Sequence, residues 1–180
     1  MKNPHDNALR SMIISAVMAA LALVLPVAFH AVGLGHYFLP MLLPLLLNGF
    51  LSSLPWAVLA GALVPWISAL LTGMPPIYPP VALIMSLEAI VLSGTASLLF
   101  RLLKRRIWPA LLAAITADRA VSFLLTWAMA SRFGISPRIA AFGTFVEALP
   151  GVALQIAVVP LVIRALRQRR SLFLDVEDYG

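Results

Sequence analysis

Long hydrophobic runs dominate the chain, and short polar or basic stretches separate them. No Asp, Glu, Lys or Arg occurs from Ser11 to Leu87. A stretch of this length without a charge is a poor surface for a water-soluble fold, whereas about 20 consecutive apolar residues cross the hydrocarbon core of a bilayer as one helix. The pattern therefore predicts an all-α integral membrane protein.

The hydrophobic runs divide into six predicted spans, which form a single transmembrane domain over residues 1–180. We count residues 39–72 as two spans, because Ser52-Ser53-Leu54-Pro55 interrupts this region and one unbroken helix would be about 50 Å long. The last span is expected to bend near Pro150-Gly151 and again near Pro160. The predicted spans are residues 11–29, 39–52, 56–72, 81–103, 109–131 and 140–167, with a tail at 168–180.

Basic residues gather at three places along this pattern. Lys2 and Arg10 precede the first span, one cluster at Arg101–Arg106 lies at the end of the fourth, and another at Arg164–Arg170 lies at the end of the sixth. The positive-inside rule predicts that all three groups are cytoplasmic, which places both termini inside and requires an even number of spans. A cleaved signal peptide is the rival interpretation of the first run, but it would leave five spans and put the basic clusters on the wrong side.

The composition narrows the possible chemistry. Cysteine is absent and the net charge of +6 is explained by the membrane topology rather than by nucleic-acid binding. The chain has no phosphate-binding loop motif and no hydrolase motif. His30 and His36 have no third ligand near them in sequence, so no metal site is predicted. We expect no catalytic residue and no cofactor in this chain.

Away from the basic clusters at their ends, the predicted spans place four charged residues inside the hydrocarbon region: Glu88, Asp118, Arg119 and Glu147. Each costs about 2.5–3.5 kcal/mol to insert, so such residues normally face a partner or a cavity. Arg119 either neutralises one of the carboxylates or contacts a ligand, and the sequence leaves both open. Asp118 is expected to point away from Arg119, because neighbouring residues on a helix diverge, and to brace another helix.

Two further segments have candidate roles. The stretch Gly73–Pro80 contains four prolines, which cannot continue a helix, so it is a fixed turn that serves either as a lid or as a plain connector. On the first span, Ser15 with Ala19 and Ala16 with Ala20 form overlapping pairs of small residues that permit close helix contact. The contact is either with the protein's own bundle or with another membrane subunit. Asn48 is expected to bond to a neighbouring helix.

A series of motifs in a definite order lies between Gly33 and Gly94. The series comprises Gly35-His36-Tyr37-Phe38-Leu39-Pro40-Met41, Pro44 to Gly49, Pro65-Trp66-Ile67-Ser68-Ala69-Leu70-Leu71-Thr72-Gly73-Met74-Pro75-Pro76, and Met85-Ser86-Leu87-Glu88. This order resembles the substrate-binding S components of energy-coupling factor (ECF) vitamin transporters. The resemblance implies a multi-pass protein of the bacterial or archaeal cytoplasmic membrane that binds a water-soluble vitamin or related micronutrient at its outer face.

The resemblance also implies partners and a mechanism. The S component would reorient in the membrane against a transmembrane T component. Two ATPase subunits, which use ATP and Mg, would drive the T component. Small residues on the first helix of the S component, here Ala16 and Ala20, would contact the T component. The hypothesis assigns substrate contacts to His36, Tyr37, Phe38, Tyr78, Glu88, Arg119, Trp127 and Glu147, and gating to Gly73, Met74, Pro75 and Pro76. Glu147, Gly151 and Gln155 would share one face of the last span. The four intramembrane charges sum to −2, which favours a neutral or cationic heterocycle unless Arg119 is free.

Two other classes of function remain open at this point. A structural membrane scaffold of the MreD type has a similar size and architecture, and a collapsed interior with a fully paired Arg119 would support it. An intramembrane enzyme would instead need Glu88, His36 and Glu147 to converge around a water-filled site.

Overall fold

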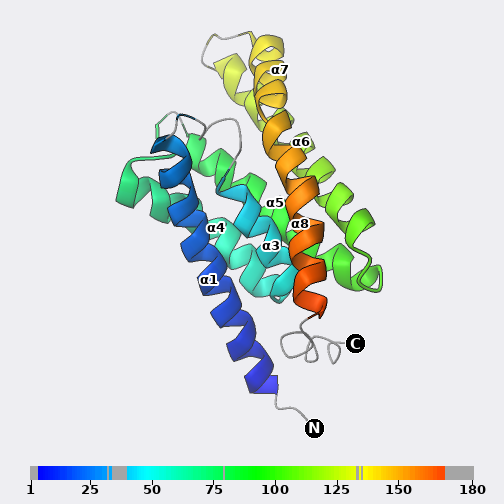
Figure 1. The fold of residues 1–180 in the computed structure, drawn as a ribbon. Helices are drawn as coiled ribbons and strands as arrows, with labels where there is room; N and C mark the ends of the chain where they lie inside the picture. The colour runs from blue at the N-terminus through cyan, green and yellow to red at the C-terminus, as the bar shows by residue number, and fades with distance from the viewer. Residues whose placement is uncertain are drawn as a thin grey trace.

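In the computed structural model, the described residues are 4–31, 33, 40–78, 80–132, 134 and 136–168, and every regular element within them is an α-helix (Figure 1). The all-α prediction is therefore confirmed for this part of the chain. The helices are α1 (Pro4–Ala31), α3 (Leu42–Leu51), α4 (Leu54–Thr72), α5 (Val81–Leu102), α6 (Ile107–Arg132), α7 (Pro137–Glu147) and α8 (Leu149–Gln168).

Five helical segments are long and apolar enough to cross a membrane. They are Asn7–Phe29, Leu54–Thr72, Val81–Leu102, Ile107–Arg132 and Pro137–Gln168, and each overlaps a predicted span. The second predicted span, 39–52, differs: its described helix, α3, has only 10 residues. At 1.5 Å per residue α3 is about 15 Å long, roughly half the thickness of the hydrocarbon core.

The short helix α3 lies at the centre of the bundle. Eight of its residues are buried, and it packs against α1, α5 and α8. Its Gly49 lies so close to α5 that an added Cβ would sit 2.5 Å from the backbone oxygen of Ser93. Asn48 donates a hydrogen bond of 2.9 Å from Nδ2 to the Oγ of Ser15 on α1, which confirms the expectation that it bonds a neighbouring helix.

The last predicted span is divided in two. Helix α7 ends at Glu147 and α8 begins at Leu149, so the interruption falls on Ala148, two residues before Pro150. Proline fits the first turn of a helix, where its missing N–H has no partner to lose, and Pro150 therefore lies inside the start of α8. Pro160 lies within the same helix.

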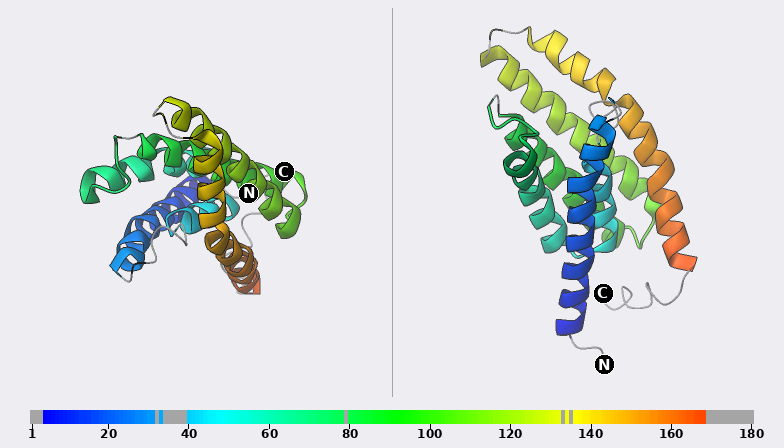
Figure 2. Two further views of the ribbon diagram at one scale, coloured as in Figure 1. Left: turned by 90° about the horizontal axis from the view of Figure 1, so that it is seen from above. Right: turned by 60° about the vertical axis from the view of Figure 1, so that its left-hand side comes forward.

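The two ends of the bundle differ in shape and charge. The start of α1, the turn between α5 and α6, and the end of α8 lie at one end, whereas the α6–α7 hairpin extends beyond the other helices at the opposite end (Figures 1 and 2). Arg105, Arg106, Arg164 and Arg167 all belong to the first end. This grouping agrees with the predicted topology, although the side of the membrane that this end faces stays a prediction.

Residues 73–78 of the Gly73–Pro80 stretch lie in the predicted turn between α4 and α5, at the end opposite Arg105, Arg106, Arg164 and Arg167. Gly73 ends α4 with a φ of 73°, which glycine adopts without steric cost. Ser68 then donates a hydrogen bond of 2.7 Å to the Met74 carbonyl oxygen, and the Ala82 N–H donates one of 3.1 Å to the Pro76 carbonyl oxygen. These bonds tie both sides of the turn to the helices that flank it.

Candidate functional site

A cluster of buried charges joins α5 and α6. Glu88 is 6% exposed, Asp118 1% and Arg119 9%. Arg119 donates two hydrogen bonds to one oxygen of Asp118, Oδ2, from Nε at 3.0 Å and from Nη2 at 2.6 Å. The same Nη2 atom lies 3.9 Å from Oε2 of Glu88. One guanidinium thus serves two carboxylates in the interior of the protein.

The arrangement corrects the expectation that Asp118 faces away from Arg119. The two Cβ atoms do diverge on the helix, but the long arginine side chain folds back along its own turn and brings the guanidinium to the shorter aspartate. Of the two roles left open for Arg119, the geometry shows the ion pair.

The polar interior is not fully satisfied by the described protein groups. Oδ1 of Asp118, Oδ1 of Asn48 and both polar side-chain atoms of Gln155 are buried without a hydrogen-bond partner in the described part of the chain. Gln155, on α8, is only 1% exposed. Buried amides and carboxylates are normally hydrogen-bonded, because leaving one unpaired costs about 1–3 kcal/mol. These atoms are therefore unpaired polar groups in the interior of the described chain.

A small hollow adjoins the charged cluster on the side of α7. It has no room for a water-sized sphere and is lined by Arg119, Ser122 and Phe123 of α6 and by Ala141 and Phe145 of α7. Pockets for small organic ligands usually measure about 300–1,000 Å³, so the hollow is smaller than a vitamin site. The sequence analysis missed Ala141 and Phe145, although their spacing of four residues, one turn of helix, was a signal that could have found them.

The predicted aromatic contacts divide between the hollow and the surface. Trp127 is 40% exposed and Tyr78 82% exposed. The Trp127 ring lies 5.8 Å from that of Phe123, which is 6.3 Å from the Phe142 ring on α7. Trp127 thus borders the hollow through Phe123. His36, Tyr37 and Phe38 lie outside the described residues.

Glu147 does not join the buried cluster. It is exposed at the end of α7, whereas Gly151 and Gln155 are buried on α8. The expected common face fails because the helix is interrupted at Ala148, which shifts α7 relative to α8. The described interior therefore contains Glu88 and Asp118 against Arg119, a formal charge of −1 rather than −2.

The remaining predicted positions lie at the surface of the bundle. Ala16 and Ala20 are exposed on α1, while Ser15, on the neighbouring stripe, is buried against the bundle. In the predicted gate, Gly73, Met74 and Pro76 are exposed and Pro75 is buried. No group of three or more His, Cys, Asp or Glu residues that could hold a metal ion occurs in the described ranges.

Comparison with known proteins identifies the protein family to which the chain belongs. The family model described as "ECF transporter, substrate-specific component" matches residues 10–163. No curated protein and no solved structure matches the chain. The match covers the buried cluster, the Gly73–Pro80 turn and most of every described helix. The chain therefore belongs to the substrate-specific components of ECF transporters, and it is a substrate-binding subunit that crosses the membrane several times.

Proposed function

We propose that this chain captures a small, water-soluble vitamin or related micronutrient at the outer face of a bacterial or archaeal cytoplasmic membrane. It delivers the molecule by reorienting against a T component, driven by two ATPase subunits that use ATP and Mg. The observation that carries this proposal is the cluster of Glu88, Asp118 and Arg119, buried inside a chain of the ECF substrate-specific family.

The charge of the cluster favours a neutral or cationic substrate. Asp118 accepts two of the five N–H donors of Arg119, and its carboxylate balances the charge of the guanidinium, which weakens the attraction of Arg119 for an anionic ligand. Oδ1 of Asp118 has no hydrogen-bond partner in the described chain, and Glu88 lies 3.9 Å from Arg119 with Ser122 within hydrogen-bonding reach. Both carboxylates accept hydrogen bonds, which suits a heterocycle that carries N–H donors or a positive charge.

Substrate entry requires the site to open. The hollow beside Arg119 has no room for a water-sized sphere, far less space than a ligand pocket provides. Helix α7 contributes one wall of the hollow and packs mainly on α6, so a displacement of α7 would enlarge it. In this proposal Glu88 and Arg119 orient the substrate, and Glu147 lies at the rim of the site. The aromatic surface comes from Tyr37, Phe38, Tyr78 and Trp127, together with His36. The entrance is gated by Gly73, Met74, Pro75 and Pro76.

The first helix supplies the docking surface for the T component in this proposal. Ala16 and Ala20 are exposed one turn apart on α1. Small residues at this spacing let two helix backbones approach closely within a membrane. The neighbouring stripe is already occupied, because Ser15 faces the protein's own bundle.

A membrane scaffold is the second candidate function, and one observation favours it. Arg119 is paired, and the hollow beside it is small, which is what a purely structural interior predicts. The family match favours transport. The two candidates differ in whether the protein retains a small molecule when it is purified from its own membrane.

Native mass spectrometry of the full-length protein tests the proposal. The wild type is expected to carry a small-molecule mass, and Glu88→Gln to lose it, because a hydrogen bond to a charged group contributes about 1.5–3 kcal/mol, or at least about tenfold in affinity. Glu177→Gln, the same substitution in the predicted tail, is the matched control and should retain the ligand.

The outcomes separate the candidates. A wild type that never carries a small molecule favours the scaffold. Retention by Glu88→Gln at the wild-type level removes Glu88 from the binding site.

A further inference from the structure

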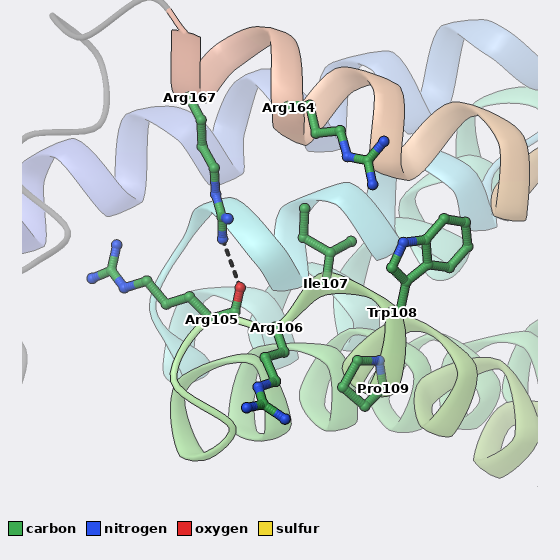
Figure 3. Close-up of a pocket in the computed structure, with 7 residues that line it drawn as sticks. All are labelled: Arg105, Arg106, Ile107, Trp108, Pro109, Arg164 and Arg167. Carbon is green, nitrogen blue, oxygen red and sulfur yellow. Dashed lines mark hydrogen bonds between the residues drawn. The ribbon is translucent and has the colours of Figure 1, made fainter.

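A second hollow lies at the other end of the protein, away from the buried charges. It is a cleft of about 360 Å³ between the last turns of α8 and the segment that joins α5 to α6. Four arginines line it: Arg105 and Arg106 from the α5–α6 turn, and Arg164 and Arg167 from α8. Trp108 and Pro109, in the first turn of α6, form an apolar part of its lining (Figure 3).

The charge of this cleft is uncompensated by the described protein groups. None of the residues that line it is acidic, and within the described residues neither the Arg106 nor the Arg164 side chain makes a hydrogen bond or an ion pair. In Figure 3 the Arg164 and Arg167 side chains extend from α8 towards the turn, whereas the Arg105 side chain extends to the side and the Arg106 side chain away from α8. All four residues line the cleft, and an anion bound there relieves the repulsion between their like charges. Arginine is also the side chain best suited to hold a phosphate, through paired N–H donors.

The cleft is built by specific contacts rather than by loose surface side chains. Arg167 donates a hydrogen bond of 2.8 Å from Nη2 to the carbonyl oxygen of Arg105 and stacks over the Phe100 ring, with its Cζ 5.2 Å from the ring centroid. These contacts join α8 to the turn. Figure 3 shows Arg164 and Arg167 extending from α8 towards the turn and the start of α6.

The α5–α6 turn has an unusual backbone at this site. Lys104 and Arg105 have φ values of 48° and 63°, a region that non-glycine residues seldom occupy. The Arg105 N–H donates a hydrogen bond of 2.7 Å to the Phe100 carbonyl oxygen, which holds the turn in place. Helix α6 begins two residues later, so its positive N-terminal end faces the same region and adds to the attraction for an anion.

The helices that form the cleft also carry exposed apolar side chains. Trp108 is 44% exposed, and Leu102 and Leu161, on the adjoining helices, are each 66% exposed. These side chains belong to segments long and apolar enough to cross a membrane. Tryptophan favours the interface between hydrocarbon and headgroups, and exposed leucines suit acyl chains. The site therefore combines a phosphate-binding centre with a hydrophobic border, which a purely water-soluble anion would not use.

We propose that the cleft formed by Arg105, Arg106, Arg164 and Arg167 binds the phosphate of an anionic phospholipid headgroup, with Trp108 and the neighbouring leucines against its acyl chains. Basic pockets between membrane helices are suited to such headgroups. The phosphate of the bound lipid is a counter-ion shared by arginines of the α5–α6 turn and of α8. It therefore strengthens the connection that the hydrogen bond from Arg167 to Arg105 already makes between these two segments. This role is independent of the substrate and of the site around Glu88.

The test is native mass spectrometry of the full-length protein in mixed micelles that contain equal amounts of dioleoylphosphatidylglycerol and dioleoylphosphatidylcholine. The wild type should retain phosphatidylglycerol over phosphatidylcholine by about tenfold, and the double variant Arg106→Gln/Arg164→Gln should bring this ratio close to unity. This variant leaves Arg167 and its contacts with Arg105 and Phe100 intact. Arg132→Gln/Arg138→Gln removes two exposed arginines from the other end and should keep the wild-type ratio.

Three results would overturn the proposal. One is equal retention of the two lipids by the wild type, and another is an unchanged preference in Arg106→Gln/Arg164→Gln. The third is full displacement of phosphatidylglycerol by inorganic phosphate, which would assign the cleft to a free phosphate anion instead. A thermal unfolding curve for each variant establishes that it is folded, and Arg164→Gln alone, with an intermediate preference expected, serves if the double variant does not fold.

Discussion

The α3–α5 region and the α6–α7 hairpin are held together in different ways. In the first region, glycines bring helices into contact: a Cβ added at Gly49 would lie 2.5 Å from the Ser93 backbone oxygen, and one at Gly61 2.8 Å from the Ala89 backbone. On α7, a Cβ added at Gly143 would meet nothing within 4 Å. The same residue type thus marks close packing in one region and open space in the other.

From this difference we infer that the α3–α5 region is a fixed platform and that α7 is a movable wall of the hollow beside Arg119. Within a membrane, helices gain little from the hydrophobic effect and associate through close packing and interhelical hydrogen bonds. The α3–α5 region has both, since Ser86 and Ser93 on α5 donate hydrogen bonds of 2.7 and 3.0 Å to carbonyl oxygens of α4. The α7 wall lacks comparable described bonds to other helices, and it lies where the candidate substrate site would open.

The largest effect on stability is expected from a substitution that breaks the charge cluster between these two regions. Arg119→Ala leaves Glu88 and Asp118 buried without their cation, and it should lower the free energy of unfolding by about 3–5 kcal/mol. Thermal or SDS-induced unfolding of the detergent-solubilised protein measures this loss. The double variant Asp118→Leu/Arg119→Met removes the pair together and should recover a large part of it. An Arg119→Ala protein as stable as the wild type would show that the ion pair is not formed.

The next largest effect tests the difference in packing between Gly49 on α3 and Gly143 on α7. Gly49→Ala forces α3 and α5 apart and should cost about 1–3 kcal/mol in the free energy of unfolding. Gly143→Ala is the matched control: it should leave stability unchanged or raise it by up to about 1 kcal/mol, because alanine favours helix over glycine. The same unfolding assay measures both variants. Equal losses at the two positions would contradict the distinction between platform and wall.

The smallest expected effect concerns one hydrogen bond that joins the α3–α5 platform to α1. A double-mutant cycle of Asn48→Ala and Ser15→Ala isolates the hydrogen bond of 2.9 Å between α3 and α1. We expect a coupling energy of about 0.6 kcal/mol and at most about 1.7 kcal/mol, the average and the maximum found for interhelical hydrogen bonds in a membrane protein. Additive single-variant losses in unfolding free energy would mean that the two side chains act independently.

The sequence predicted the positions of most helices well, because charges and prolines mark their ends. The turn at Gly73–Pro80 and the basic turn after α5 are examples, and α5 begins at the predicted residue, Val81. The length of α3 could not be predicted in the same way. An apolar run of 14 residues, 39–52, indicates burial, but it does not distinguish a full span from a short helix enclosed by protein.

The candidate site was predicted less completely, for two physical reasons. Helical periodicity gives the direction of a Cβ atom but not the path of a long side chain, so the pairing of Arg119 with its neighbour Asp118 was missed. Periodicity also assumes an unbroken helix, and the interruption at Ala148 separates Glu147 from Gln155. The proximity of Arg119 to Glu88 was one of the alternatives that the sequence left open, and the distance of 3.9 Å supports it.

The hydroxyl contacts of α1 fix its rotation about its own axis. Ser11 donates a hydrogen bond of 3.0 Å to the Ser53 hydroxyl, and Ser15 donates one of 3.0 Å to the Trp56 carbonyl oxygen. Because these two serines lie one turn apart, a rotation of the helix by a single residue would break both bonds. The stripe of Ala16 and Ala20 therefore points in one direction before any partner arrives, and a helix that docks there loses less orientational freedom than it would against a freely rotating one.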